Sequence, residues 1–181
     1  MNPDHPKMTP KFNFLRILLV FFVLVLSSFS RQEWSYYKID GNLSARFPSK
    51  PQYLKNGPNQ IWLSYLSDTV FVEVSKRSDI VNFDSRNPAK TKKFFAELKE
   101  GYLASQPGAK VSKEAIKTLD KRSTYYFEFD ALSRDGKRKI HSSLLYVINK
   151  ADLYKFGLTE SGEQRVGDKS VRDFIYSGQF N

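Results

Sequence analysis

The clearest hydrophobic pattern in the chain is a strict alternation of apolar and polar residues between Ser123 and Ser133. Its apolar positions are Tyr125, Phe127, Phe129 and Ala131. Alternation with a period of two is typical of a strand with one buried face. Asp135-Gly136 follows, a dipeptide that favours a two-residue hairpin loop. A hairpin closed there places Phe127 opposite Leu144 and Asp130 opposite His141, so the apolar residues of both strands share a face.

A third strand is predicted from Leu153 to Leu158. Its apolar positions are Tyr154, Phe156 and Leu158. A three-residue loop, Lys150 to Asp152, would pair them with Ile148, Tyr146 and Leu144 respectively. The pattern therefore predicts a three-stranded antiparallel meander.

Shorter strands are predicted upstream of this meander. Trp34–Ile39 and Leu43–Phe47 flank a turn at Gly41, and Gln60–Leu66 and Thr69–Lys76 read as a hairpin. In the second strand of that hairpin, valines alternate with other residues at positions 70, 72 and 74. These segments add further antiparallel pairs to the sheet.

Two helices are predicted to flank these strands. The first begins at Pro88 with Asn87 as its N-cap and ends at Pro107-Gly108. Its apolar stripe, which we expect to pack on the sheet, consists of Phe94, Phe95, Leu98, Tyr102 and Leu103. The second helix has Asp168 as its N-cap and carries Val171, Phe174 and Ile175 at helical spacing; Gly178 would end it, and Phe180 could fold back on it. The fold class expected is α+β, a mainly antiparallel sheet flanked by helices.

The first 30 residues have the three parts of a secretory signal. Lys7, Lys11 and Arg16 precede an apolar run from Ile17 to Leu26, and small serines follow at positions 27, 28 and 30. The run is too short to cross a bilayer comfortably as a helix. We therefore expect a signal peptide at 1–30 and a periplasmic or secreted mature chain at 31–181. An uncleaved N-terminal anchor is the alternative, because Phe29 can lengthen the run.

The composition excludes several kinds of site. The chain has no cysteine, so disulfides and thiolate metal sites are excluded, and residues 31–181 contain one histidine, His141. No nucleophile elbow, zinc-binding helix motif, phosphate loop or dinucleotide fingerprint occurs. The sequence predicts neither an enzyme nor a bound cofactor or metal.

One cluster of polar residues is a candidate for a catalytic or metal-binding site. The predicted hairpin register brings together Glu128, Asp130, His141 and Ser143 on its polar face. Acid, imidazole and hydroxyl side by side could transfer protons or hold an adventitious metal. They are also ordinary cross-strand pairs on a solvated face, which is the interpretation we favour, because no positioned nucleophile or oxyanion donor can be named.

The charge is strongly positive. The chain has 29 basic and 19 acidic residues, and only three of the former and one of the latter lie in 1–30. A possible anion-binding surface in the predicted hairpin consists of Arg134, Lys137, Arg138 and Lys139. Such a cluster would attract anionic lipid or acidic glycan, or would simply be solvated. Nucleic acid is not expected, since no nucleic-acid-binding signature occurs.

The order of elements resembles exported PsbP-like domains. The residues that carry the resemblance are Trp34, Tyr37, Gly41, Phe47, Pro48 and Pro51 at the start, and Phe174, Ser177 and Phe180 at the end. The resemblance spans Trp34 to Asn181 and implies the α/β/α sandwich shared by PsbP-like and Mog1-like proteins. It also implies a module that docks on other proteins.

Three functions remain open at this point. The first is a non-catalytic exported module of the cell envelope that docks on a protein partner. The second is a binder of anionic envelope lipid or acidic glycan through the basic surface, which predicts that binding weakens with salt. The third, an enzyme of unrecognised type, requires Asp130 and His141 to border a cleft.

Overall fold

The computed structural model describes residues 34–78, 80, 87–162 and 166–181, which belong to one compact unit, Trp34–Asn181. The predicted N-terminal signal lies outside the described residues. The strands of the compact unit are β1 (Ser35–Lys38), β2 (Leu43–Phe47), β3 (Gln52–Asn56), β4 (Asn59–Ser67), β5 (Val70–Arg77), β6 (Lys110–Leu119), β7 (Arg122–Leu132), β8 (Lys139–Asn149), β9 (Asp152–Ser161) and β10 (Gln179–Phe180). The helices of this unit are α2 (Pro88–Leu103) and α3 (Asp168–Ile175).

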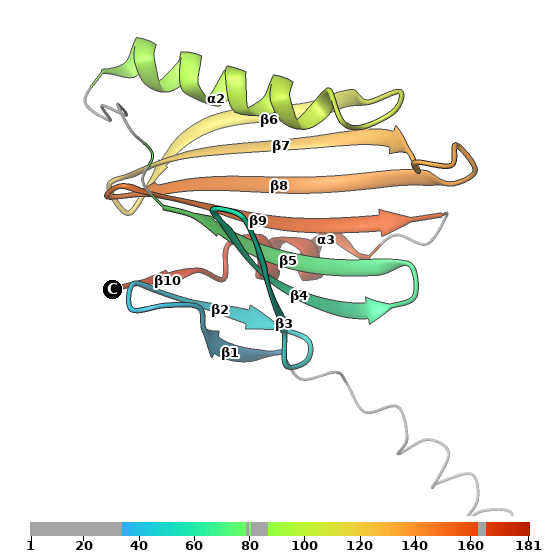
Figure 1. Ribbon diagram of the computed structural model, residues 1–181, viewed down its shortest axis with the longest axis horizontal. Helices are drawn as coiled ribbons and strands as arrows, with labels where there is room; N and C mark the ends of the chain where they lie inside the picture. Colours follow the sequence, from blue (N-terminus) through green and yellow to red (C-terminus); the bar gives the residue numbers. More distant parts are fainter. Residues whose placement is uncertain (1–33, 79, 81–86, 163–165) are drawn as a thin grey trace, which may run out of the picture. The chain divides into compact units, whose positions relative to one another are not determined.

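The strands form two antiparallel sheets (Figure 1). The large sheet has the order β3-β4-β5-β9-β8-β7-β6, and the small one has the order β1-β2-β10. Helix α2 covers one face of the large sheet, while α3 and the small sheet cover the other. The α+β fold class is therefore confirmed.

Each face of the large sheet has its own hydrophobic core. Under α2, Phe95 is fully buried and stacks on Tyr125 with ring centroids 5.3 Å apart. On the opposite face, Phe174 of α3 packs edge-on against Phe47 of the small sheet and Phe156 of β9. Burial of apolar side chains on both faces is the main source of stability in such a layered domain.

The predicted pairing of β7 with β8 is confirmed. Phe127 pairs with Leu144, and Asp130 pairs with His141. The loop differs, because the chain turns through four residues, 134 to 137, rather than two. Gly136 has a φ of 70° but Asp135 does not take a positive φ, whereas a two-residue type I′ loop needs both. Asp135 instead accepts hydrogen bonds from Ser133 Oγ and Lys137 N.

The predicted register of β8 with β9 is wrong by one residue. Tyr154 pairs with Val147 rather than Ile148, because the loop is Lys150-Ala151 and Asp152 already pairs with Asn149. Lys150 makes this short loop possible by adopting a φ of 57°. A shift of one residue moves every side chain to the other face. Tyr154 and Phe156 consequently lie in the core beneath α3 and the small sheet.

Strands β3 and β6 were not predicted. Both are outer strands of the large sheet, and nearly all their residues are exposed, so neither carries the apolar alternation that marks a half-buried strand. The second helix also differs slightly from expectation, since Gly167 is its N-cap and Asp168 its first residue. Phe180, which was expected to fold back on this helix, lies in β10, and its ring is 5.4 Å from that of Tyr154 in β9.

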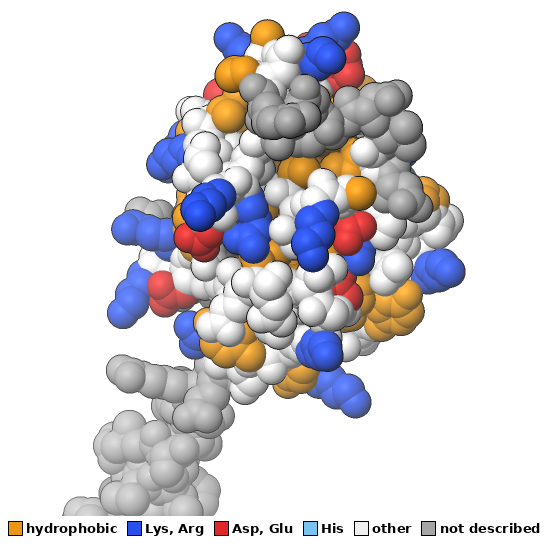
Figure 2. Space-filling model, turned by 90° about the vertical axis from the view of Figure 1, so that its left-hand side faces the viewer, with side chains coloured by type: hydrophobic (Ala, Val, Ile, Leu, Met, Phe, Trp, Pro, Cys, Tyr) orange, Lys and Arg blue, Asp and Glu red, His pale blue; other side chains and the backbone are white. Residues whose placement is uncertain are grey.

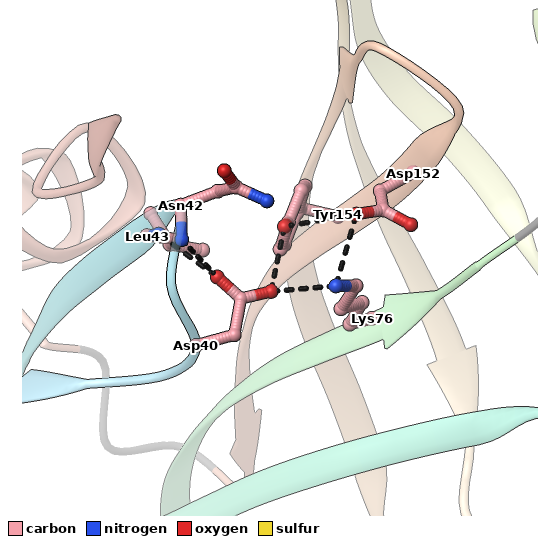
Figure 3. Close-up of polar contacts among 6 residues, drawn as sticks. All are labelled: Asp40, Asn42, Leu43, Lys76, Asp152 and Tyr154. Atoms are coloured by element: carbon pink, nitrogen blue, oxygen red, sulfur yellow. Dashed lines mark hydrogen bonds and ion pairs between the residues drawn. The ribbon is translucent and has the colours of Figure 1, made fainter. Parts of the chain in front are cut away.

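A network of partly buried charges ties the small sheet to the large one (Figure 3). Asp40, in the turn between β1 and β2, accepts from Lys76 Nζ of β5 at 2.7 Å and from Tyr154 Oη of β9 at 2.8 Å. Lys76 also lies 2.9 Å from Asp152. The other oxygen of Asp40 accepts from the backbone N–H groups of Asn42 and Leu43, which fixes the turn itself.

Candidate functional site: a cleft beside helix α3

A cleft of about 410 Å³ lies between α3, the outer strand β6 and its neighbour β7. We call it the α3 cleft; the polar and aromatic side chains that line it are Lys113, Lys117, Tyr126, Glu128, Arg172 and Tyr176. Strand pairing explains why they meet. Lys113 lies opposite Glu128, and Lys117 lies opposite Thr124, on the face away from α2. The α3 cleft therefore has a rim of cations contributed by both β6 and α3.

Two tyrosines form an aromatic wall in the α3 cleft. The rings of Tyr126 and Tyr176 stack with centroids 6.4 Å apart, and Lys113 Nζ lies 5.4 Å from the centre of the Tyr126 ring. Tyr176 is 43% exposed, so part of its ring is open to a partner. Aromatic and guanidinium side chains are the ones that most often dominate binding energy at protein interfaces.

Glu128 is the acidic group inside this basic rim. Its carboxylate accepts hydrogen bonds from Tyr126 Oη and, at 3.2 Å, from Lys113 Nζ. Burial by itself raises the pKa of Glu128, but the hydrogen bonds from Tyr126 and Lys113 outweigh it and hold that pKa below its usual value. Burial, followed by the hydrogen bond to Glu128, raises the pKa of Tyr126. Glu128 is therefore ionised at neutral pH and fixes the lysine and the tyrosine.

The predicted polar cluster lies at one end of the α3 cleft. A smaller hollow of about 230 Å³, lined by Glu128, His141, Ser143, Glu160 and Val171, meets the cleft at Glu128 and Val171. His141 Nδ1 lies 2.9 Å from Asp130 Oδ1, as the register predicts. Ser143 is 3% exposed, and the partner of its hydroxyl is Tyr126 rather than His141. The four residues thus share a face without forming an acid, base and nucleophile relay.

Metal binding finds no support in the described part of the chain. Among those residues, no group of three or more histidine or acidic side chains is placed to hold an ion.

Neither described helix is long and apolar enough to cross a membrane.

The predicted anion-binding surface lies elsewhere. Arg134, Lys137, Arg138 and Lys139 are all exposed in and beside the loop between β7 and β8, on the right in Figure 1. They do not line the α3 cleft. Whether they bind anions stays a prediction.

Sequence reasoning missed most of the α3 cleft. Lys113 and Lys117 were not identified because β6 was not predicted, and Tyr126, Arg172 and Tyr176 were not identified either. One signal could have found part of it: Lys113, Ala115 and Lys117 are spaced for one face of a strand.

The fold matches known structures although no family description and no curated protein matches the sequence. The solution structure of cyanobacterial PsbP (CyanoP) from Synechocystis sp. PCC 6803 aligns with 84% of this chain and 95% of its own, with a TM-score of 0.56 and 13% identity. The chain therefore has the PsbP-like fold, which confirms the predicted resemblance. At this identity the similarity shows the fold alone.

Two further structures align less closely. The Ran-binding protein Mog1p of Saccharomyces cerevisiae aligns with 82% of this chain and 95% of its own, with a TM-score of 0.49 and 6% identity. LpqN, involved in cell envelope biogenesis of Mycobacterium tuberculosis, aligns with 82% of this chain and 91% of its own, with a TM-score of 0.43 and 13% identity.

Proposed function

We propose that this chain is a non-catalytic exported module that binds a protein partner in the α3 cleft. The observation that carries the proposal is the position of the cleft beside β6, an outer strand whose ten residues are nearly all exposed. An outer strand offers backbone hydrogen-bonding groups to an added strand, and a neighbouring cleft accepts alternate side chains of that strand.

The partner segment we propose is extended and acidic. The rim supplies Lys113, Lys117 and Arg172, of which only Lys113 is paired with a carboxylate among the described residues. A segment with acidic residues at every second position would place them against Lys117 and Arg172. An apolar residue between two of these acidic residues would then pack against the aromatic wall of Tyr126 and Tyr176.

The non-catalytic part of the proposal is supported by the arrangement of the polar cluster. Among the described residues, the hydrogen-bond partner of His141 is Asp130 and not a hydroxyl, since Ser143 is buried and interacts with Tyr126. General acid–base chemistry needs the proton donor or acceptor within hydrogen-bond reach of the reacting group. The export part of the proposal rests on residues 1–30.

The experiment that tests this function is capture of the partner with charge-reversed variants. Tagged wild-type chain is used to capture proteins from an envelope extract of the source cells, and Lys117→Glu with Arg172→Glu is compared with it. The control is Lys137→Glu with Arg138→Glu, which changes the charge by the same amount in the β7–β8 loop.

Our proposal predicts one protein that the wild type and the loop variant retain and the cleft variant loses. Retention by all three variants would exclude the α3 cleft. Loss in the loop variant instead, with lipid or acidic glycan in the eluate, would support the alternative of an anion binder through Arg134, Lys137, Arg138 and Lys139.

A further inference from the structure

A second hollow, of about 380 Å³, opens at the end of the sheet opposite the β7–β8 loop. The central strands β7 and β8 separate there. Their pairing ends at Thr124 and Val147, while the residues beyond continue in pairs with β6 and β9 respectively. The hollow lies between the resulting two hairpin turns, and the charged or amide side chains that line it are Asp120, Lys121, Arg122, Asn149 and Lys150.

The two turns hold charged residues in a backbone conformation that favours glycine. Asp120, Lys121 and Lys150 have φ values of 48°, 64° and 57°, and among the described residues these three are the non-glycine residues with positive φ. Two-residue hairpin loops require positive φ values, so these turns hold their charged side chains in fixed positions beside the hollow. Both lysines are exposed, and neither forms an ion pair with a described residue.

Asn149 lines this hollow and has a side-chain donor that is not used. Its Oδ1 accepts from Arg122 Nε at 3.1 Å, and because Nε can only donate, this contact fixes which amide atom is the oxygen. The other atom, Nδ2, is buried and has no hydrogen-bond partner among the described residues, and Asn149 as a whole is 7% exposed. A buried donor without a partner in a polar hollow is a feature that a ligand would satisfy.

Arg122 is held in place before any ligand arrives. Its Nη1 donates to the backbone oxygen of Asp120 at 3.3 Å, and its guanidinium lies 4.7 Å above the ring of Phe180. Stacking and hydrogen bonding restrict the side chain, so less conformational entropy is lost when the remaining N–H groups bind. Figure 2 looks onto this end of the domain, where Lys and Arg side chains are more prominent than acidic ones.

We propose that this hollow, the turn pocket, binds a phosphate group through Lys121, Arg122, Lys150 and the Asn149 amide. With Asp120 as the one carboxylate lining it, the turn pocket combines three cations and one anion, which suits a phosphate monoester dianion. Because Nδ2 is covered, a ligand reaches it only by displacing the atoms that cover it. The proposal is independent of the α3 cleft, with which the turn pocket shares no residue.

Asn149→Asp is the most specific test of the turn pocket. The substitution keeps the oxygen that accepts from Arg122 and replaces the unpaired donor with a second carboxylate oxygen of similar size. The protein is purified in the form that the source cells produce. It is titrated with inorganic phosphate at constant ionic strength, and its amide resonances are followed by NMR.

We expect saturable shifts of the Asn149 side-chain amide and of the backbone amides of Lys121, Arg122 and Lys150. Asn149→Asp should raise the Kd about tenfold or more, since a charge-assisted hydrogen bond is replaced by repulsion. The double variant Lys121→Gln with Lys150→Gln should also weaken phosphate binding. It serves as the test of the turn pocket if Asn149→Asp does not fold. Lys137→Gln, in the opposite loop, should leave the Kd unchanged.

Shifts without saturation, an unchanged Kd in Asn149→Asp, or an equal effect of Lys137→Gln would overturn the proposal. The source of the phosphate is distinguished by sedimentation with vesicles that contain phosphatidic acid, a lipid phosphate monoester, against vesicles of phosphatidylcholine alone. Binding to the first that is lost in Asn149→Asp identifies a lipid headgroup. Binding of inorganic phosphate without binding to either vesicle identifies a soluble phosphate.

Discussion

Lys76 donates a 2.7 Å hydrogen bond to Asp40, and this contact joins two sheets that share no strand. Both side chains are largely buried, with 13% and 17% of their surface exposed. Tyr154 donates to the same oxygen of Asp40, and Asp152 lies on the other side of Lys76 (Figure 3). The network thus anchors the turn between β1 and β2 to the centre of the large sheet.

Removing Asp40 should destabilise the domain strongly. Asp40→Ala removes the nearer acceptor of Lys76 and Tyr154, which then share only Asp152, and it leaves the turn without its cap. We therefore expect the free energy of unfolding to fall by about 2–4 kcal/mol. Urea unfolding followed by tryptophan fluorescence measures this. The control is Glu97→Ala, which removes an exposed ion pair with Lys93 at 3.8 Å. This change should lower the free energy of unfolding by less than about 0.5 kcal/mol.

Asp40 should also contribute to acid unfolding. Burial alone raises the pKa of Asp40, but the hydrogen bonds from Lys76 and Tyr154 outweigh it and lower that pKa below 3.8. The carboxylate therefore stabilises the fold fully above its unfolded pKa, and this contribution is lost as the pH falls through the lower folded pKa.

The variant Asp40→Asn isolates this contribution. We expect a lower free energy of unfolding than wild type at pH 7, with the difference shrinking steadily between about pH 5 and pH 2. Urea midpoints measured at each pH provide the comparison. A difference that stays constant with pH would show that Asp40 acts through its shape and not through its charge.

Gly178 should tolerate no side chain, in contrast to Gly101. A Cβ at Gly178 would lie 2.7 Å from Phe156 Cζ in the core, whereas one at Gly101 of α2 meets nothing within 4 Å. Gly178→Ala should lower the free energy of unfolding by about 1–3 kcal/mol through overpacking. Gly101→Ala should raise it by about 0.5–1 kcal/mol through helix propensity. Thermal unfolding of the two variants gives opposite shifts of Tm if the packing is as described.

Lys155 and Glu73 should be strongly coupled beneath α2. Their charged atoms lie 2.6 Å apart, and the two side chains are only 16% and 15% exposed. Lys155 Nζ also lies 5.1 Å from the centre of the Tyr102 ring. Burial alone lowers the pKa of Lys155, but Glu73 more than reverses this effect.

A double-mutant cycle with Lys155→Met and Glu73→Gln should give a coupling free energy of about 1–3 kcal/mol, since either single change leaves the other group buried and unpaired. The same cycle at Lys93 and Glu97 should give about 0.3–0.5 kcal/mol. Equal coupling in the two cycles would contradict the buried arrangement.

The sequence predicts the β7–β8 register because two independent signals agree there. The alternation of Tyr125, Phe127 and Phe129 and the turn at Asp135-Gly136 both place Asp130 opposite His141, and the register survives although the loop is longer than predicted. The β8–β9 register has no such support. Residues 144 to 148 are apolar at every position because β8 is buried on both faces, so parity cannot distinguish neighbouring registers.

The candidate site is harder to predict because it depends on an exposed strand. β6 is dominated by polar and charged residues, and its position beside β7 is known only once the sheet is assembled. Glu128, His141 and Ser143 were identified through the β7–β8 pairing. Arg172 and Tyr176 reach the α3 cleft through the packing of α3, which no local pattern in the sequence encodes.

The most direct test of the proposed function is site-specific photo-crosslinking in the source cells. A photoreactive amino acid replaces Ala115, which lines the α3 cleft, or Ser105, which is exposed at the end of α2. We expect the probe at position 115 to form a covalent adduct with one exported protein, through a segment rich in Asp and Glu, and the probe at position 105 to form none. Equal crosslinking from both positions, or none from position 115 in cells that contain the partner captured by the wild type, would contradict a binding role for the cleft.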